Sequence, residues 1–403
     1  MRELRRQVLL AAGAALASVG LPAVAAKRYD SGASDTEILI GQTLPYSGPL
    51  SMLGSLGKTA SAWFDKVNAE GGINGRKVRL LSVDDGYSPP KTVEMTRKLV
   101  ERDGVLLMFG AVGTASNMAV HKYLNSKKVP QLLIMTGSSH WNDPKGHPWT
   151  IAAMMSYPTE ARMYARHMLA TVAEPRIAIL SQNDDFGRDY VNGFKAELGD
   201  RAARMIVAEA TYEVSDPTVD SQMVTLAASD ANVFFSVTNG KFTVQALRRA
   251  GDRGWKPQLY LPVGTTSIAS ILKPAGYDNA KGAITIANQK NPLDPQWRDD
   301  AGIREYYAFV KQWAPGQNPE DTINVSGYSM ARVLTEVLRR CGDELTRENV
   351  MRQMQSLRGF STPVMLPGVS LSTSADNYEI YDAIGLQRFD GASWVPFGEA
   401  IRR

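Results

Sequence analysis

Short runs of apolar residues alternate with longer segments whose apolar residues recur at helical spacing. Residues 37–43, 77–83, 105–109 and 131–135 have the apolar character of buried strands. Residues 52–70, 89–102 and 117–126 lie between them and predict helices; in the first, Leu53, Leu56, Ala60 and Phe64 fall on one face. Apolar strands alternating with amphipathic helices indicate a parallel, doubly wound sheet that is buried on both faces.

The same alternation then repeats. Residues 159–172, 186–198 and 241–250 predict helices, and residues 176–180, 205–211, 233–236 and 258–261 predict strands. Further helices are expected at 303–313, 325–340 and 347–356, followed by closing strands at 378–388 and 393–397. Two successive units of similar size predict an α/β protein with two Rossmann-like lobes.

The first 26 residues have the pattern of a signal peptide. A charged start is followed by an apolar stretch from Val8 to Leu21 and by a small-x-small sequence that ends at Ala25. We therefore expect export to the periplasm with cleavage near Ala25. A membrane anchor is the alternative, but the apolar run is short for a span. Arg5-Arg6 also leaves open whether export is general secretory or twin-arginine.

Composition narrows the functional classes. The chain has 403 residues, 44% of them hydrophobic, which is enough for a large core shared by two domains. Its net charge of +4 is spread along the sequence without a basic patch, so we expect no nucleic-acid partner. Cys341 is the only cysteine, so an intrachain disulfide is impossible.

The segment 68–78, Asn-Ala-Glu-Gly-Gly-Ile-Asn-Gly-Arg-Lys-Val, is the most informative motif. It predicts a helix that ends at two glycines, a tight turn and re-entry into a strand. Together with the loop 41–49, Gly-Gln-Thr-Leu-Pro-Tyr-Ser-Gly-Pro, it resembles the opening of the branched-chain amino acid-binding proteins. These are type I periplasmic solute-binding proteins of ABC importers.

The resemblance implies a clamshell of two lobes joined by three crossover strands. By analogy, the chain crosses near Ile151, Ala287 and Val364. Residues 36–151 and 287–364 would form lobe 1, and residues 152–286 and 365–403 lobe 2. The resemblance also implies a monomer that binds a small molecule, uses no cofactor, and delivers its ligand to ABC permease and ATPase subunits.

Four loops follow predicted strands, where open α/β sheets bind ligands: residues 45–52, 110–116, 136–141 and 183–187. The first contains Tyr46 and Ser47, and the second and third are rich in glycine and hydroxyl groups, including Gly137. In the family, equivalent loops hold the ligand α-carboxylate, and the resemblance carries that role to Thr114, Ser116, Thr136 and Ser138. Alternatively, such residues only cap helices.

The sequence departs from the amino acid binders of this family at three positions. Phe186 stands where they have a tyrosine, and Asn239 aligns with another family tyrosine. The loop 261–266, Leu-Pro-Val-Gly-Thr-Thr, lacks the acidic residue that pairs with the ligand ammonium. Since a buried ammonium needs a counter-charge, a carboxylate without an amine is the better candidate.

Apolar and aromatic side chains would fill the rest of the pocket. The candidates are Tyr46, Met52, Trp141, Tyr157, Phe186 and Val263. They suit an aromatic acid of the benzoate or hydroxycinnamate type, although each alone could be an ordinary core residue. A branched-chain or other aliphatic amino acid receptor is the alternative, as is a ligand sensor for a membrane kinase.

Signals for an enzyme or a metal site are weak. The sequence has no Gly-x-Ser-x-Gly, phosphate-binding loop or His-Glu-x-x-His motif. His140 and His147 lie close together, but no further ligand spacing completes a metal site. We therefore expect a receptor without catalytic residues, and a secreted hydrolase is the rival class.

Overall fold

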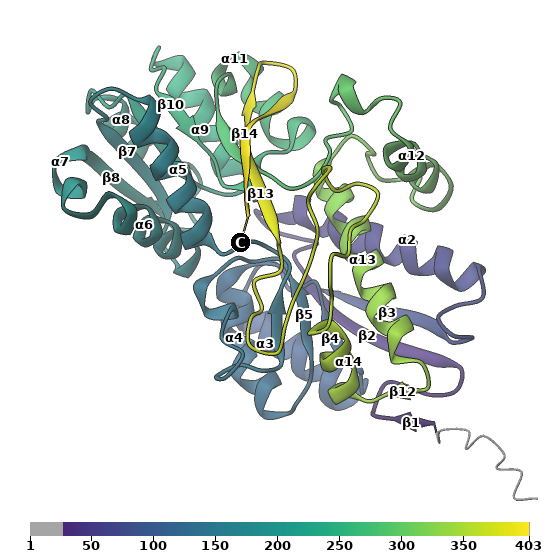
Figure 1. Cartoon of the computed structure of the whole chain (residues 1–403). Coiled ribbons are helices and arrows are strands. Elements are labelled where there is room, and N and C mark those ends of the chain that lie inside the picture. Colours follow the sequence, from purple (N-terminus) through teal and green to yellow (C-terminus); the bar gives the residue numbers. More distant parts are fainter. Residues whose placement is uncertain (1–26, 403) are drawn as a thin grey trace, which may run out of the picture.

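The computed structural model describes residues 27–402, which form two α/β lobes (Figure 1). The predicted signal peptide lies outside the described residues. The first lobe contains a parallel five-stranded sheet in the order β3-β2-β4-β5-β6. Its strands are β2 (Glu37–Leu44), β3 (Lys77–Asp84), β4 (Leu107–Phe109), β5 (Gln131–Ile134) and β6 (Thr150–Ala152). The predicted doubly wound fold is confirmed.

The second lobe contains a seven-stranded sheet in the order β14-β13-β11-β10-β9-β7-β8. Five of its strands are parallel: β7 (Ile177–Gln182), β8 (Ile206–Tyr212), β9 (Val233–Val237), β10 (Gln258–Tyr260) and β11 (Ile284–Ala287). A C-terminal hairpin of β13 (Ala383–Phe389) and β14 (Trp394–Arg402) adds to it antiparallel.

Helices cover the two sheets. Those of the first lobe are α2 (Ser55–Ala69), α3 (Pro89–Arg97), α4 (Thr114–Ser126), α12 (Ala301–Trp313), α13 (Thr322–Cys341) and α14 (Arg347–Met354). Those of the second are α5 (Tyr157–Thr171), α6 (Asp185–Leu198), α7 (Ala202–Met205), α8 (Asp220–Ala227), α9 (Lys241–Asp252), α10 (Lys273–Ala275) and α11 (Tyr277–Ala280). Among the residues from 27 to 402, no helix is long and apolar enough for a membrane span.

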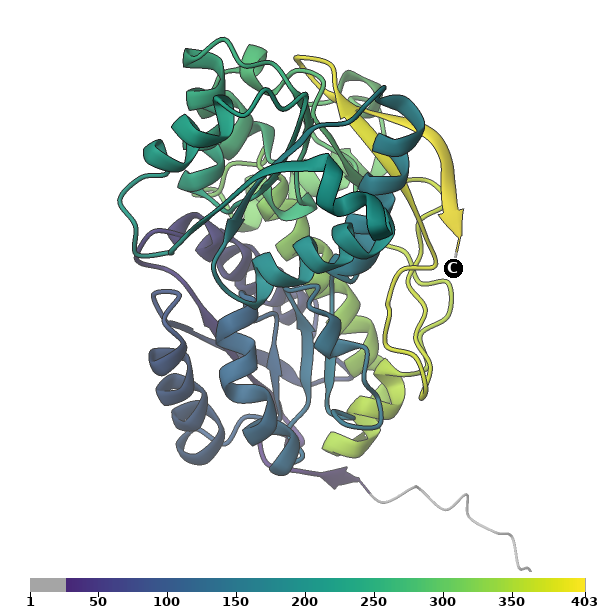
Figure 2. The ribbon, with the colours of Figure 1, turned by 90° about the vertical axis from the view of Figure 1, so that its left-hand side faces the viewer.

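The chain passes between the lobes three times. It leaves the first lobe after β6, returns after β11 to α12 and α13, and leaves again after α14 to reach β13. Figure 2 shows this last segment along one side of the molecule. The second and third passages pair, because Lys290 N–H donates to Val364 O at 2.8 Å. The lobe boundaries given above remain a prediction.

The late helix α13 belongs to the first lobe because it packs against α2. Trp63 donates its indole N–H to Thr335 Oγ1 at 2.9 Å, and its ring meets Tyr328 edge-on at 5.2 Å. The helix is mostly buried, and its N-terminus points to the junction between the lobes.

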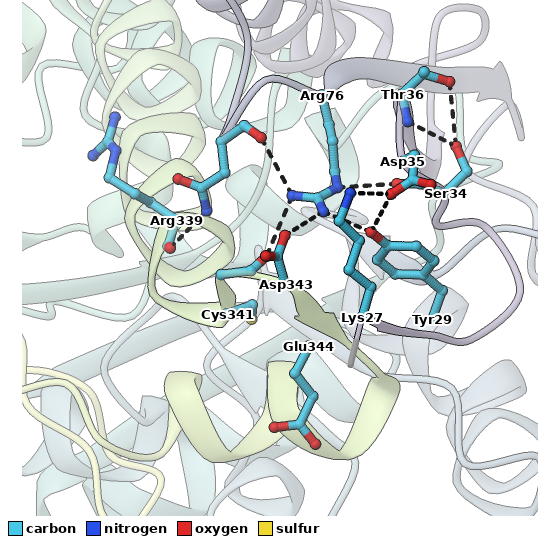
Figure 3. Close-up of polar contacts among 12 residues, drawn as sticks. Lys27, Tyr29, Ser34, Asp35, Thr36, Arg76, Arg339, Cys341, Asp343 and Glu344 are labelled. Carbon is cyan, nitrogen blue, oxygen red and sulfur yellow. Dashed lines mark hydrogen bonds and ion pairs between the residues drawn. The ribbon is translucent and has the colours of Figure 1, made fainter. Parts of the chain in front are cut away.

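The glycine-rich motif joins α2 to the start of β3 in the first lobe, and Figure 3 shows the contacts of its Arg76. A Cβ on Gly72, at φ +76°, would lie 2.1 Å from Arg76 O, so the turn requires glycine. The buried Arg76 guanidinium donates to Asp343 Oδ1 at 2.6 Å and to the Tyr29 hydroxyl at 2.7 Å. The turn therefore ties β1 (Arg28–Tyr29) to the segment between α13 and β12 (Glu344–Leu345).

The predicted strand at 378–388 is wrong over its first five residues. Tyr378 lies outside the sheet, where its hydroxyl accepts from Gln355 Nε2 at 2.6 Å and donates to Pro148 O at 3.0 Å. Helix α4 also begins at Thr114, earlier than predicted. This places Thr114 and Ser116 in its first turn.

Candidate ligand cavity

A cavity of about 120 Å³ lies between the lobes. It is bounded by residues that follow strands of both sheets and by segments that pass between the lobes. Its lining consists of Leu53, Leu56, Tyr87, Val112, Gly113, Thr114, Met135, Ala153, Met154, Met155, Tyr157, Phe186, Tyr190, Asn239, Pro262, Val263, Gly264, Ser267, Ile286, Asn288, Gln289, Thr322, Ile323, Ser326, Met330 and Tyr381. Within residues 27–402, none of these lining side chains is acidic or basic.

The N-terminus of α4 opens into the cavity at Gly113 and Thr114. Gly113 is the N-cap at φ +97°, and no side chain caps the first turn. The N–H groups of this turn lack intrahelical partners and carry the positive end of the helix dipole. Ser116, in the same turn, is buried and does not line the cavity, and its Oγ has no hydrogen-bond partner among the described residues. This end of the cavity is suited to an anion.

Thr136 lies directly behind this end. Its Oγ1 is 2.7 Å from Thr114 Oγ1, and it accepts from Trp141 Nε1 and the Tyr157 hydroxyl, each at 3.3 Å. Thr136 is fully buried and does not line the cavity. It therefore orients the Thr114 hydroxyl and the Tyr157 ring.

Three rings of the second lobe form an aromatic wall. Tyr157 stacks on Tyr190 with ring centres 4.4 Å apart, and Phe186 meets each of them edge-on at 5.3 Å. Burial raises the pKa of Tyr157 to about 12, so its hydroxyl stays protonated at neutral pH. The wall offers ring faces and edges to an apolar ligand.

Tyr87, which the sequence did not identify, lines the cavity from the first lobe. Its backbone is left-handed at φ +59°, a rare conformation for a bulky residue, and its N–H donates to Asp85 Oδ1 at 2.9 Å. A Cβ on Gly113 would lie 2.6 Å from the Tyr87 ring, so this ring covers the start of α4. Gln182 and Asp184 of the second lobe lie close enough to the Tyr87 hydroxyl to influence its pKa. The sequence feature that could have pointed to Tyr87 is an aromatic residue in the loop directly after β3.

Val263 and Asn239 line the cavity from the second lobe. Asn239 precedes α9, and its N–H donates to the Tyr212 hydroxyl at 3.1 Å. The Val263 N–H donates at 2.8 Å to Glu160, a buried carboxylate on α5 that the sequence did not identify. In the sequence it is one of several charges on a helix that also carries Arg162 and Arg166, so no signal identified it. Glu160 does not line the cavity. Its carboxylate lies behind this loop and is already hydrogen-bonded to the protein.

Five of the predicted site residues thus line one cavity: Thr114, Tyr157, Phe186, Asn239 and Val263. The others lie outside its lining. Ser138 and Trp141 are buried, Ser138 accepting from His140 N and Trp141 packing on Ala111 and Ile134. Gly137 packs so tightly that a Cβ would lie 2.1 Å from Met155 O.

The predicted loop 45–52 also lies outside this lining. The Tyr46 hydroxyl is 2.5 Å from Ser82 Oγ, beside a separate open groove, and Ser47 donates to Asp84 Oδ2 at 2.7 Å. Met52 packs near Gly240 at the start of α9. Pairing with β3 turns this loop away from the cavity.

Two further contacts join the lobes. The Ser139 N–H donates to Asp189 Oδ2 at 2.9 Å, and Ser267 Oγ donates to Asp321 Oδ1 at 2.8 Å. Asp189 lies on α6, and Asp321 caps α13. With Tyr87, these contacts join the lobes around the cavity.

Two lobes that enclose a small cavity at their junction define a solute-binding protein of the type I periplasmic fold. The chain belongs to the periplasmic binding protein family, whose match covers residues 37–377.

The known proteins to which this chain is similar are described with different ligands. A Leu/Ile/Val-binding protein homolog 7 of Brucella abortus is 20% identical over 327 residues, covering 79% of this chain and 80% of its own. A branched-chain amino acid ABC transporter structure from Thermus thermophilus, with bound valine, has a TM-score of 0.81 at 16% identity, covering 92% and 98%. A solute-binding protein of Rhodopseudomonas palustris BisB5, in complex with 3,4-dihydroxy benzoic acid, has a TM-score of 0.73 at 16% identity, covering 91% and 97%.

Proposed function

We propose that this protein is a periplasmic receptor that captures a small aromatic carboxylate of the benzoate or hydroxycinnamate type for an ABC importer. One observation carries the proposal: an uncharged cavity lining combines an uncapped helix N-terminus with a wall of three aromatic rings. The α4 N-terminus would bind the carboxylate, and the rings would contact the ligand body.

The size of the cavity supports a ligand with one ring. At about 120 Å³ it is close to the engineered apolar cavity of about 150 Å³ that binds benzene in another protein. Four methionines, Met135, Met154, Met155 and Met330, line it with flexible, polarisable side chains. Such side chains accommodate differently substituted rings and make favourable sulfur–aromatic contacts.

The lining argues against an α-amino acid. An ammonium group here would have no carboxylate among the described lining residues, and burying an unpaired charge is costly. Asp184, an acidic residue near Tyr87 that does not line the cavity, caps α6 and accepts from Gln182 Nε2 at 2.6 Å. Burial raises the pKa of Asp184, which weakens it further as a counter-charge.

A receptor for branched-chain or other aliphatic amino acids is the second candidate. It is favoured by the relatives described as Leu/Ile/Val-binding protein homologs and by the valine-bound structure. In either case we propose export through the N-terminal segment, a monomer, and delivery to separate permease and ATPase subunits. A sensor for a membrane kinase would use the same ligand site.

A thermal-shift screen followed by calorimetry tests the proposal. One set contains benzoate, 3,4-dihydroxybenzoate, phenylacetate and 4-hydroxycinnamate; the other contains leucine, isoleucine, valine and phenylalanine. Ligand at about 100 times its dissociation constant stabilises the folded state by about 2.7 kcal/mol, a readily measured shift. We expect stabilisation by the first set alone. Stabilisation by the amino acids alone would overturn the proposal.

A further inference from the structure

Glu160 is a fully buried carboxylate directly behind two walls of the cavity. It lies in the first turn of α5. Its Oε1 accepts from the Val263 N–H at 2.8 Å and from the Tyr164 hydroxyl at 2.5 Å, and its Oε2 accepts from the Tyr190 hydroxyl at 2.8 Å. Two of these three donors, Val263 and Tyr190, belong to residues that line the cavity. Glu160 therefore fixes both walls without contacting the cavity itself.

The hydrogen bonds of this network can take two arrangements, because the Tyr164 hydroxyl lies within reach of more than one acceptor. It also lies 2.9 Å from Leu261 O and 3.2 Å from Thr285 Oγ1, and it accepts from the Ile286 N–H at 3.2 Å. A hydroxyl has one proton, so it cannot donate to Glu160 and Leu261 O together. If Glu160 is protonated, Glu160 donates to Tyr164, and Tyr164 donates to Leu261 O. Both protonation states of Glu160 thus keep a bonded network.

The groups packed around Glu160 are uncharged at neutral pH. Helix α5 contributes Tyr157 and Tyr164, and α6 contributes Tyr190. The loop after β10 and strand β11 contribute peptide groups and the Thr285 hydroxyl. Among these groups, ionised Glu160 would therefore be the negative charge that acts on an anion in the cavity. Its buried surroundings would screen the repulsion between the two charges poorly.

We propose that Glu160 is a positioning residue that couples capture of an anionic ligand to uptake of a proton. The proposal rests on the proposed function, because it requires a ligand carboxylate in this cavity. Repulsion between the two carboxylates favours protonation of Glu160 when the anion binds, and by linkage the anion binds more tightly when Glu160 is protonated. Burial raises the pKa of Glu160 from its ordinary 4.5 to about 7, so this exchange falls in the neutral range.

Calorimetry with benzoate tests the coupling, because benzoate stays ionised across the neutral range. In the wild type we expect the dissociation constant to rise about fivefold between about pH 6 and about pH 8, if binding raises the pKa of Glu160 by about 1. The Glu160→Gln variant retains hydrogen-bonding partners but cannot ionise, so its affinity should be independent of pH. Equal pH profiles in the two proteins would overturn the proposal.

A second variant and a matched control make the result specific. Tyr164→Phe removes a hydrogen bond that stabilises ionised Glu160, so the midpoint of the pH profile should move upward. Glu197→Gln changes a carboxylate on α6 that pairs with Arg166 at 2.9 Å, away from the cavity lining, and should leave the profile unchanged. An unmoved midpoint in Tyr164→Phe would contradict the network.

Unfolding separates this inference from the proposed function. Because the folded state raises the pKa of Glu160, its protonation favours folding, and this contribution is lost as pH rises from about 4.5 through about 7. We expect that loss in the wild type and not in Glu160→Gln. Benzoate binding at neither pH would overturn the proposed function and with it the coupling, whereas equal unfolding profiles would overturn the titration of Glu160.

Discussion

Phe186 offers the most direct residue-level test of the aromatic wall. Its ring lines the cavity and packs edge-on against both Tyr157 and Tyr190. Phe186→Ala removes ring contact and buried apolar area, so we expect benzoate affinity to fall by about 1–3 kcal/mol, roughly five- to 150-fold. Titration calorimetry at one pH measures the change.

The matched control for Phe186→Ala is Tyr277→Ala. Tyr277 is an aromatic residue on α11 that is partly exposed and lies outside the cavity lining. Its removal should leave the dissociation constant unchanged. If Phe186→Ala also binds benzoate as the wild type does, Phe186 has no part in the site.

At the scale of elements, Arg76 joins three segments at the edge of the first sheet that lies opposite the cavity. It precedes β3, whereas ligands approach the carboxyl ends of the strands. Arg76→Met leaves Asp343 and Tyr29 without their donor. Because Asp343 is half exposed, we expect the unfolding free energy to fall by about 1–3 kcal/mol, with benzoate affinity unchanged.

Denaturant unfolding measures this loss. Arg79→Met is the matched control, because Arg79 lies on the same region of the chain but is exposed and only approaches Glu37 at 3.6 Å. It should change stability by less than about 0.5 kcal/mol. Equal effects of the two variants would mean that the Arg76 network contributes nothing beyond an ordinary surface charge.

The sequence predicted best those helices and strands whose apolar residues form a pattern within a short stretch of the chain. The buried strands β5 and β9 are nearly continuous apolar runs, β2 contains the apolar run Ile38–Ile40, and amphipathic spacing located α2 and α6. The strand predicted from 378 began too early because apolar residues there pack against other segments instead of a sheet. The pattern of apolar residues alone does not distinguish a strand of a sheet from an irregular segment that packs against its neighbours.

The cavity depends on contacts between segments distant in sequence. Thr114, Phe186 and Val263 could be predicted because they follow strands, where ligands bind in such sheets, and because the resemblance to the branched-chain amino acid-binding proteins assigns ligand contacts to their loops. Tyr87 also follows a strand, but its place in the cavity depends on a left-handed backbone and on neighbours in the other lobe, which the sequence does not show. Glu160 was missed because its importance arises from three donors supplied by three different elements.

At the scale of the whole molecule, few polar contacts hold the lobes together across the cavity. The Ser139–Asp189 contact is exposed, so it contributes modestly and breaks easily. Ligand contacts with both lobes would add to these bonds, so ligand should shift an open–closed equilibrium toward the closed arrangement. We expect the radius of gyration, about 21 Å for a compact chain of this length, to decrease on saturation with benzoate. Small-angle scattering with and without ligand measures this change.

Asp189→Ala tests the same equilibrium without altering the cavity lining. Loss of the two bonds from Ser139 favours the open form, so benzoate affinity should fall by about 0.5–1.5 kcal/mol and the ligand-free protein should be larger in solution. Asp200→Ala, a change in the same lobe away from the lobe junction, should alter neither quantity. If saturating ligand compacts neither the wild type nor Asp189→Ala while still binding, the lobes do not close over the ligand, and the receptor works as a preformed cavity.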